Sequence, residues 1–145
     1  IVAKNTGILM ASPKSDGRGS ISLGPMLAVD HLSNDFFFAG AASGGATAPT
    51  ALVSVALSNV VDVLSLENSI KAERIHNSGN PNIVYFEKGY DEKAIDELIK
   101  KGHQVAEVQA LGRANAVGCT EGLINDSKSC EARTDPRGFG LAVKI

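Results

Sequence analysis

Tryptophan is absent from this 145-residue chain, which has only two cysteines, two methionines and three histidines. With so few histidines and cysteines, none at metal-ligand spacing, the sequence predicts neither a metal centre nor a cofactor. The formal charge is −2 and no basic stripe is present, so we expect no nucleic-acid partner. No apolar run is long enough to span a membrane. These shortages leave a globular domain as the expected class.

The composition is that of one globular domain. Hydrophobic residues make up 43% and charged residues 21% of the chain, which are ordinary proportions. A chain of 145 residues is long enough for one hydrophobic core, so we treat residues 1–145 as a single domain. The chain begins at Ile1 in strand-like sequence, without an initiator methionine or a signal peptide. We therefore expect a piece of a longer polypeptide.

The most distinctive stretch is the glycine-rich segment 40–49, with Gly44 and Gly45 at its centre. It follows the apolar run 36–39 and precedes the apolar segment 52–63, a pattern typical of strand, turn and helix. Backbone N–H groups in such a turn, at the positive end of a helix dipole, suit a bound anion or a transient oxyanion. A tight, close-packed connection without a ligand is the other interpretation.

Periodicity and turn residues predict alternating strands and helices. Strands are expected at 1–10, 21–29, 36–39, 82–87, 104–108, 114–119, 130–134 and 139–143. Helices are expected from about 47 to 63, from 66 to about 75 after Ser65 as N-cap, and from Asp91 as N-cap to a stop at Gly102. This order favours an α+β or layered α/β fold in which helices cover an antiparallel sheet.

Cys119 and Cys130 flank a polar, turn-forming stretch. Two cysteines on either side of a hairpin loop can face each other across the strands, and a disulfide would close that loop. Two unrelated free thiols, as in a cytosolic protein, are the alternative. We expect the disulfide, and with it an oxidising compartment.

The sequence holds no complete set of catalytic residues. We interpret His76 and His103 as residues that close helix C-termini, and His31 as part of a turn. The G-x-S-x-G elbow and the full Walker and Rossmann fingerprints are missing. Gly44 and Gly45 therefore form a candidate oxyanion site without a nucleophile or a base beside it.

Seven short segments follow one another along nearly the whole chain. They are T-G-I-L at 6–9, R-G-S-I-S-L-G-P at 18–25, A-A-S-G-G-A at 41–46, A-E-R-I-H at 72–76, E-K-G-Y at 87–90, G-H-Q-V at 102–105 and T-D-P-R at 134–137. In this order and spacing they resemble the C-terminal part of the small subunit of γ-glutamyltranspeptidases. These are N-terminal-nucleophile hydrolases that cleave themselves.

The resemblance implies an αββα sandwich and a γ-glutamyl substrate such as glutathione. It implies a threonine nucleophile freed by autoproteolysis, whose amine is the base and whose hydroxyl forms an acyl-enzyme. Gly44 and Gly45 occupy the place of the oxyanion donors. Ser22 stands in register with the second of two serines that hold the glutamyl α-carboxylate, while Ile21 replaces the first and Ser20 lies one place earlier.

The resemblance also implies partners and a location. The partners are the remainder of the same precursor, namely the large subunit and the threonine-bearing start of the small subunit. Together with the expected disulfide, this favours a periplasmic or secreted protein.

Several features depart from the family pattern. Ile1 is not a nucleophile, so the catalytic threonine must precede this chain or belong to another chain. The family motif whose aspartate reads the substrate α-amino group has become 11–16, where Asp16 could partly stand in. The following loop is shorter than usual, which predicts a more open cleft, and the loop between Cys119 and Cys130 is longer than the family hairpin.

Three functional hypotheses follow. The first is a γ-glutamyltranspeptidase-like hydrolase or transferase whose nucleophile lies outside this chain, so that the isolated chain is inactive. The second is a catalytically degenerate domain of the same fold that binds a partner, which the altered aspartate and serine positions favour. The third is a phosphate- or nucleotide-binding domain, which needs a Lys-Ser/Thr pair at the glycine turn that the sequence lacks.

Overall fold

A computed structural model describes residues 25–143 of the chain. The strand predicted at 1–10 and the candidate substrate-binding residues Asp16, Ser20 and Ser22 lie outside the described residues.

The elements alternate much as the sequence patterns predict. In chain order they are β1 (Met26–Val29), β2 (Phe36–Ser43), η1 (Gly45–Thr47), α1 (Ala48–Val60), α2 (Leu66–Lys71), β3 (Ile75–His76), β4 (Ile83–Glu87), α3 (Glu92–Lys100), β5 (Gln104–Val108), β6 (Arg113–Cys119), η2 (Ser127–Ser129) and β7 (Cys130–Arg133).

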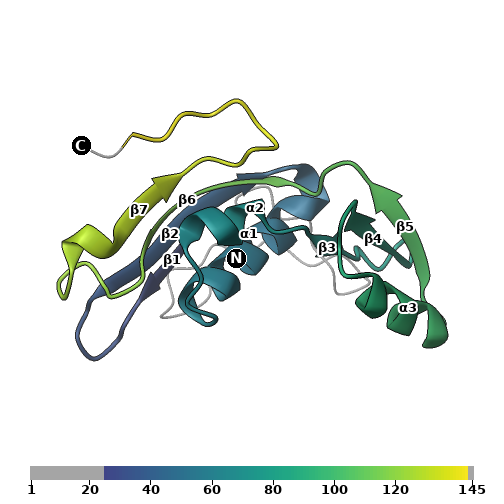
Figure 1. Cartoon of the computed structure of the whole chain (residues 1–145), viewed down its shortest axis with the longest axis horizontal. Helices are drawn as coiled ribbons and strands as arrows, with labels where there is room; N and C mark the ends of the chain where they lie inside the picture. The colour runs from purple at the N-terminus through teal and green to yellow at the C-terminus, as the bar shows by residue number, and fades with distance from the viewer. Residues whose placement is uncertain (1–24, 144–145) are drawn as a thin grey trace, which may run out of the picture.

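A four-stranded antiparallel sheet of order β1-β2-β6-β7 forms the larger part of the fold, and α1 and α2 cover one of its faces (Figure 1). The buried core between helices and sheet consists of Phe38, Leu52, Val55, Ala56, Leu66, Ile70, Ala114 and Ala116. Alternate residues of β2 and β6 face this core because successive strand side chains point to opposite faces. The predicted α+β class, with helices covering an antiparallel sheet, is confirmed here.

A smaller sheet of order β3-β4-β5 lies at the other end of the molecule, together with α3 (Figure 1). β3 and β4 are antiparallel, but β4 and β5 are parallel. The parallel pair forms because α3 carries the chain back to the end at which β4 began, as in any βαβ unit. The expectation of antiparallel sheet alone is therefore wrong for this part.

Helix starts agree with the sequence prediction because capping is local. Ser65 caps α2 by accepting the Asn68 N–H at 3.3 Å, and Asp91 caps α3 by accepting the Lys93 N–H at 2.9 Å. Gly102 follows α3 with φ of 86°, the left-handed conformation that ends many helices.

Three predicted boundaries are wrong. α2 ends at Lys71 instead of about 75, because the following residues pair with β4: the Arg74 N–H donates to Glu87, and the Glu87 N–H donates to the Arg74 carbonyl. β2 does not end at 39 but continues to Ser43, paired with β6. Residues 139–143 form no strand, and among the described strands none pairs with them.

The disulfide between Cys119 and Cys130 is confirmed, and the two residues are direct partners at the end of β6 and β7. Replacing both cysteines by alanine is expected to lower the free energy of unfolding by about 3 kcal/mol, because the unfolded chain loses a loop constraint spanning 11 residues. Urea unfolding measures this. The reduced wild-type protein is the control and should match the variant. An unchanged midpoint in both would contradict the prediction.

Candidate active site

The glycine turn connects β2 to α1 in a conformation that only glycine adopts readily. Gly44 has φ of 129° and Gly45 has φ of 62°, and both residues are exposed. The Gly44 carbonyl accepts the Thr47 hydroxyl at 2.9 Å and the Thr47 N–H at 3.3 Å. Neither Gly44 nor Gly45 donates its own N–H to another described residue. The turn therefore presents two adjacent N–H groups at the start of a helix, and within residues 25–143 neither has an acceptor.

The two glycines differ in their surroundings. A Cβ built on Gly44 would lie 2.8 Å from the Gly112 Cα and 2.8 Å from the Thr47 Oγ1, whereas a Cβ built on Gly45 meets no atom within 4 Å. A side chain at position 44 would therefore collide with the backbone at Gly112, which packs directly against Gly44. Gly45 borders open space on the side where a Cβ would project, and the residue is exposed.

His76 contacts the first turn of α1 through a hydrogen bond with Thr50. Its Nδ1 lies 2.7 Å from the Thr50 Oγ1, and the Thr50 hydroxyl lies 3.2 Å from the Thr47 carbonyl oxygen. A proton on Nδ1 satisfies both contacts, since the imidazole then donates to Thr50 and Thr50 donates to Thr47. His76 lies on β3 and not at a helix end, so the predicted helix-closing role is wrong.

His76 makes stability depend on pH. Burial lowers its pKa below the ordinary value of 6.5, so below that pH the unfolded chain binds a proton more readily than the native protein. The contribution of neutral His76 is complete above about pH 6.5 and is lost as the pH falls through its native pKa.

The free energy of unfolding of the wild-type protein is therefore expected to fall more steeply on acidification than that of His76→Gln. Urea unfolding at a series of pH values from about 7.5 to about 5 measures the two slopes. His103→Gln, at an exposed position after α3, is the control and should keep the wild-type slope. Equal slopes for His76→Gln and the wild type would contradict this prediction.

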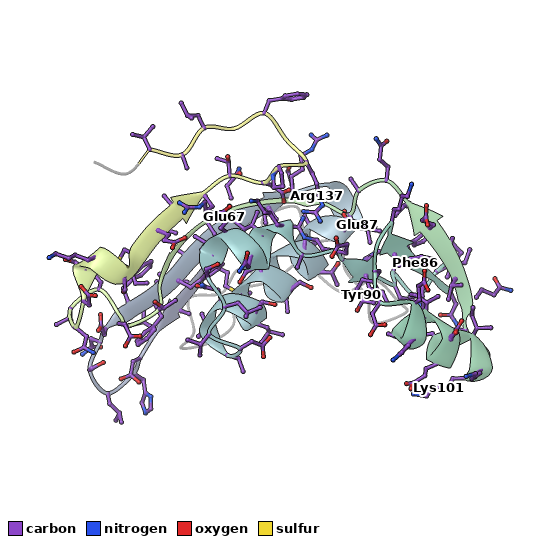
Figure 2. The ribbon with its side chains drawn as sticks, viewed as in Figure 1. Glu67, Phe86, Glu87, Tyr90, Lys101 and Arg137 are labelled. Atoms are coloured by element: carbon purple, nitrogen blue, oxygen red, sulfur yellow. A yellow bond between two sulfur atoms is a disulfide. The ribbon has the colours of Figure 1, made fainter. Side chains whose placement is uncertain are left out.

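Four charged residues form a buried network where the two sheets meet: Arg74, Glu87, Asp135 and Arg137 (Figure 2 labels Glu87 and Arg137). Arg74 Nη2 lies 2.8 Å from Asp135 Oδ2, and Arg137 Nη1 lies 3.2 Å from Asp135 Oδ1. Arg137 also pairs with Glu87, through Nε at 2.7 Å and through Nη2. The network joins α2, β3, β4 and the segment after β7.

Electrostatics inside this network favour the charged forms of Asp135 and Arg137. Burial acts to raise the pKa of Asp135, but the N–H groups of Ala114 and Arg137 and the Arg74 guanidinium outweigh it and hold the pKa below its usual range. Burial acts to lower the pKa of Arg137, and the carboxylates of Glu87 and Asp135 outweigh it and raise the pKa. For Asp135 and Arg137 the partners thus outweigh burial, whereas for Arg74 burial outweighs the attraction of Asp135 and lowers the pKa.

All four network residues lie inside the motif segments at 72–76, 87–90 and 134–137, but the motifs do not identify them as partners of one another. The sequence feature that could have indicated the network is a charged residue at a position where an apolar residue is expected. Glu87 ends an otherwise apolar strand, and Arg74 lies in a segment that was predicted to be helical with Ile70 and Ile75 facing inward. Charged residues are rarely fully buried unless paired, so such positions predict a buried ion pair.

The other face of the four-stranded sheet is apolar and open. Leu27, Ala39, Val117 and Ala132 are neighbours across the four strands on the side away from the helices, and they line a groove of about 720 Å³. Leu27 and Val117 are 66% and 41% exposed. Such a surface is unusual on an independent domain.

Other kinds of site are not found in the described part of the chain. Within residues 25–143, no group of three or more histidine, cysteine or acidic residues is arranged to hold a metal ion. None of the described helices has the length and apolar character needed to cross a membrane. Of the predicted site residues, the structure places Gly44 and Gly45 together in the turn and joins Cys119 to Cys130.

The sequence model of the γ-glutamyltranspeptidase family matches residues 12–145. This chain belongs to the γ-glutamyltranspeptidase family. The match covers six of the seven segments on which the resemblance was based, all but the one at 6–9, and it confirms that resemblance. No curated protein sequence matches the chain.

Solved structures of γ-glutamyltranspeptidases share the fold. The enzyme from Pseudomonas nitroreducens, complexed with L-DON, superposes with a TM-score of 0.71 at 20% identity, over 100% of this chain and 86% of that one. The T380A mutant of the Helicobacter pylori γ-glutamyltranspeptidase gives 0.69 at 24% identity, over 95% and 70%. The Bacillus anthracis transpeptidase enzyme CapD gives 0.65 at 17% identity, over 99% and 84%. The mixed α+β architecture described above is therefore that of γ-glutamyltranspeptidase structures.

Proposed function

We propose that this chain is part of an enzyme that hydrolyses or transfers a γ-glutamyl or related acyl group through an acyl-enzyme on a threonine outside residues 1–145. Gly44 and Gly45 donate their N–H groups to the oxyanion. The observation that carries this proposal is the pair of adjacent left-handed glycines at the start of a helix, whose N–H groups donate to no other described residue, within a chain that belongs to the γ-glutamyltranspeptidase family.

The chemistry needs this turn at one moment. The threonine hydroxyl attacks the acyl carbonyl, the N-terminal amine takes the hydroxyl proton, and negative charge develops on the carbonyl oxygen. The Gly44 and Gly45 N–H groups stabilise that charge without having to reorganise. When the tetrahedral intermediate collapses, the amine of the substrate leaves and takes the proton from the N-terminal amine. The acyl group remains on the threonine as an ester. Water or an acceptor amine then attacks the ester and frees the threonine.

Substrate recognition falls on residues of the N-terminal segment. Ser22, with Ser20 beside it, is proposed to hold the α-carboxylate of the glutamyl group, and Asp16 to bind its α-amino group. Glutathione is a fitting substrate because it carries a γ-glutamyl amide. The replacement of the first family serine by Ile21 favours the alternative, a catalytically degenerate domain of the same fold.

The open sheet face supports the finer fold assignment, an αββα sandwich. In that arrangement a second sheet packs on the face lined by Leu27, Ala39, Val117 and Ala132, and stacked sheets lie about 10 Å apart. We propose that the remainder of the same precursor supplies this second sheet. The Cys119–Cys130 disulfide favours a periplasmic or secreted location.

The proposed function is tested with the complete protein that contains this chain and γ-glutamyl-4-nitroanilide as substrate. Nitroaniline release is expected, together with a small-subunit mass increased by one glutamyl group when the reaction is quenched early. Replacing the nucleophilic threonine by alanine should abolish both. A processed, folded protein that shows neither would support the degenerate domain instead.

A further inference from the structure

The buried ion network reaches the backbone of the loop between β5 and β6. Glu87 Oε1 accepts the Leu111 N–H at 2.6 Å, and Arg74 Nη1 donates to the carbonyl oxygens of Leu111 and Gly112, both at 3.3 Å. Leu111 is 5% exposed and Arg74 only 2%. Three polar backbone groups of this loop are therefore fixed by two buried, charged side chains.

The same loop supports the glycine turn. The Gly112 Cα lies where it would meet a Cβ on Gly44 at 2.8 Å. A Cβ on Gly112 would in turn lie 2.8 Å from the Ala51 Cβ and 3.1 Å from the Thr47 carbonyl oxygen. Gly112 thus packs directly between Gly44 and the first turn of α1. Because close-packed backbone leaves no space between these segments, any shift of the loop also displaces the glycine turn.

Arg74, just before β3, and His76, in β3, contact two different segments next to the glycine turn. Arg74 and His76 are two residues apart in extended chain, so their side chains leave the backbone on the same side. Arg74 reaches the loop under Gly44, and His76 reaches Thr50, which lies 3.2 Å from the Thr47 carbonyl. One short segment therefore supports both Gly44 and the start of α1.

We propose that Arg74 and Glu87 are positioning residues for the acyl-transfer reaction: through Leu111 and Gly112 they set where the Gly44 N–H points. This proposal rests on the proposed function of the turn. Neither side chain touches the substrate. Their effect is on the geometry of a donor that must meet the oxyanion, and displacement of such a group by about 1 Å costs on the order of a hundredfold in rate.

The network contains its own matched control. Arg137 pairs with both carboxylates of the network, those of Glu87 and Asp135. It also donates to the carbonyl oxygens of Ile70 and Ala72, but not to the loop between β5 and β6. Arg74→Lys and Arg137→Lys each keep a positive charge and lose a guanidinium fork. Only Arg74→Lys also loses the contacts to Leu111 and Gly112.

The test is steady-state kinetics of the complete enzyme with γ-glutamyl-4-nitroanilide, on protein shown to be folded and processed. Arg74→Lys is expected to lower kcat by about tenfold or more while KM changes by less than about threefold, and Arg137→Lys is expected to keep kcat within about threefold of wild type. Equal kcat in the two variants, or a change confined to KM, would overturn the proposal.

Gly112→Ala keeps the proposal testable if Arg74→Lys does not fold. This substitution keeps all four charged side chains and should lower kcat with KM retained, so a wild-type kcat in folded Gly112→Ala would also overturn the proposal. If the wild-type enzyme itself does not turn over γ-glutamyl amides, the proposed function fails, and crystal structures of the two lysine variants decide the positioning role separately. The Gly44 amide should be displaced in Arg74→Lys and unmoved in Arg137→Lys, and an unmoved amide in both would reject the proposal.

Discussion

Replacing Glu87 by glutamine is expected to lower the free energy of unfolding by about 3–5 kcal/mol, because it breaks a buried ion pair and leaves Asp135 as the one described carboxylate that compensates Arg74 and Arg137. Glu87 is 3% exposed, and each of its oxygens accepts two donors. Oε1 accepts from the Leu111 N–H and Arg137 Nε, and Oε2 accepts from the Arg74 N–H and Arg137 Nη2. Glutamine removes the charge and also turns an NH₂ group toward these donors.

Urea unfolding of the complete protein at neutral pH measures this loss. Glu67→Gln is the control: Glu67 on α2 also pairs with two cations, Lys71 and Arg133, but its side chain is 47% exposed (Figure 2). Exposed ion pairs contribute little because water screens them, so the control should unfold close to the wild-type midpoint. Similar midpoints for Glu67→Gln and Glu87→Gln would show that the network does not hold the two sheets together.

Gly45→Val is expected to lower kcat/KM for a γ-glutamyl amide by about a hundredfold, the cost typical of losing one oxyanion donor. Valine at φ of 62° is strained, so the peptide rotates and carries the N–H away from its direction in the turn. The side chain also enters the open space beside the turn.

Gly102→Val controls for the backbone strain. Gly102 has φ of 86°, and a Cβ built on it also meets no atom within 4 Å, but it lies at the end of α3, far along the chain from the turn. Steady-state kinetics should give near wild-type kcat/KM for this variant, although both variants lose similar stability. If the two variants turn over substrate equally, the loss in Gly45→Val is a folding effect and the oxyanion role of this turn is wrong.

Local signals made much of the fold predictable. Capping by Ser65 and Asp91, the glycine after α3 and the strand patterns of β4 and β5 act within a few residues of one another, and the structure confirms these helix starts, the helix end and both strands. The Cys119–Cys130 disulfide belongs to the same group, because a polar loop between two strands places the cysteines opposite each other.

Contacts between distant segments account for the wrong boundaries. Gly40 suggested a turn, yet it lies inside β2 because a Cβ there would come within 2.8 Å of Leu52 on α1. β3 replaces the last turn of the predicted helix because Arg74 pairs with Glu87, 13 residues later. Residues 139–143 were predicted as a strand, but Phe139 and Leu141 are exposed and unpaired with any described strand.

In the candidate site, too, local features could be predicted from the sequence and contacts between distant segments could not. Gly44 and Gly45 were predicted from a local glycine pattern, and their positive φ values fit the role. The support from Gly112 could not be predicted, since 68 residues separate it from Gly44 and glycine leaves no side-chain signal. In the four-residue network, burial of charge could be predicted, but the pairing of partners could not, because the members come from three segments that are distant in the sequence.

The central claim is that the Gly44–Gly45 turn binds an oxyanion, and binding of a tetrahedral analogue tests it most directly. A glutamate analogue with a boronic acid in place of the γ-carboxyl group forms a tetrahedral anion on the threonine hydroxyl and resembles the transition state. Its Kd is measured for the complete wild-type enzyme, Gly45→Val and Gly102→Val, alongside the Kd of glutamate. The account predicts a Kd for the boronate about a hundredfold higher in Gly45→Val alone, with glutamate binding unchanged in all three proteins. Equal boronate affinity in the two variants would contradict it.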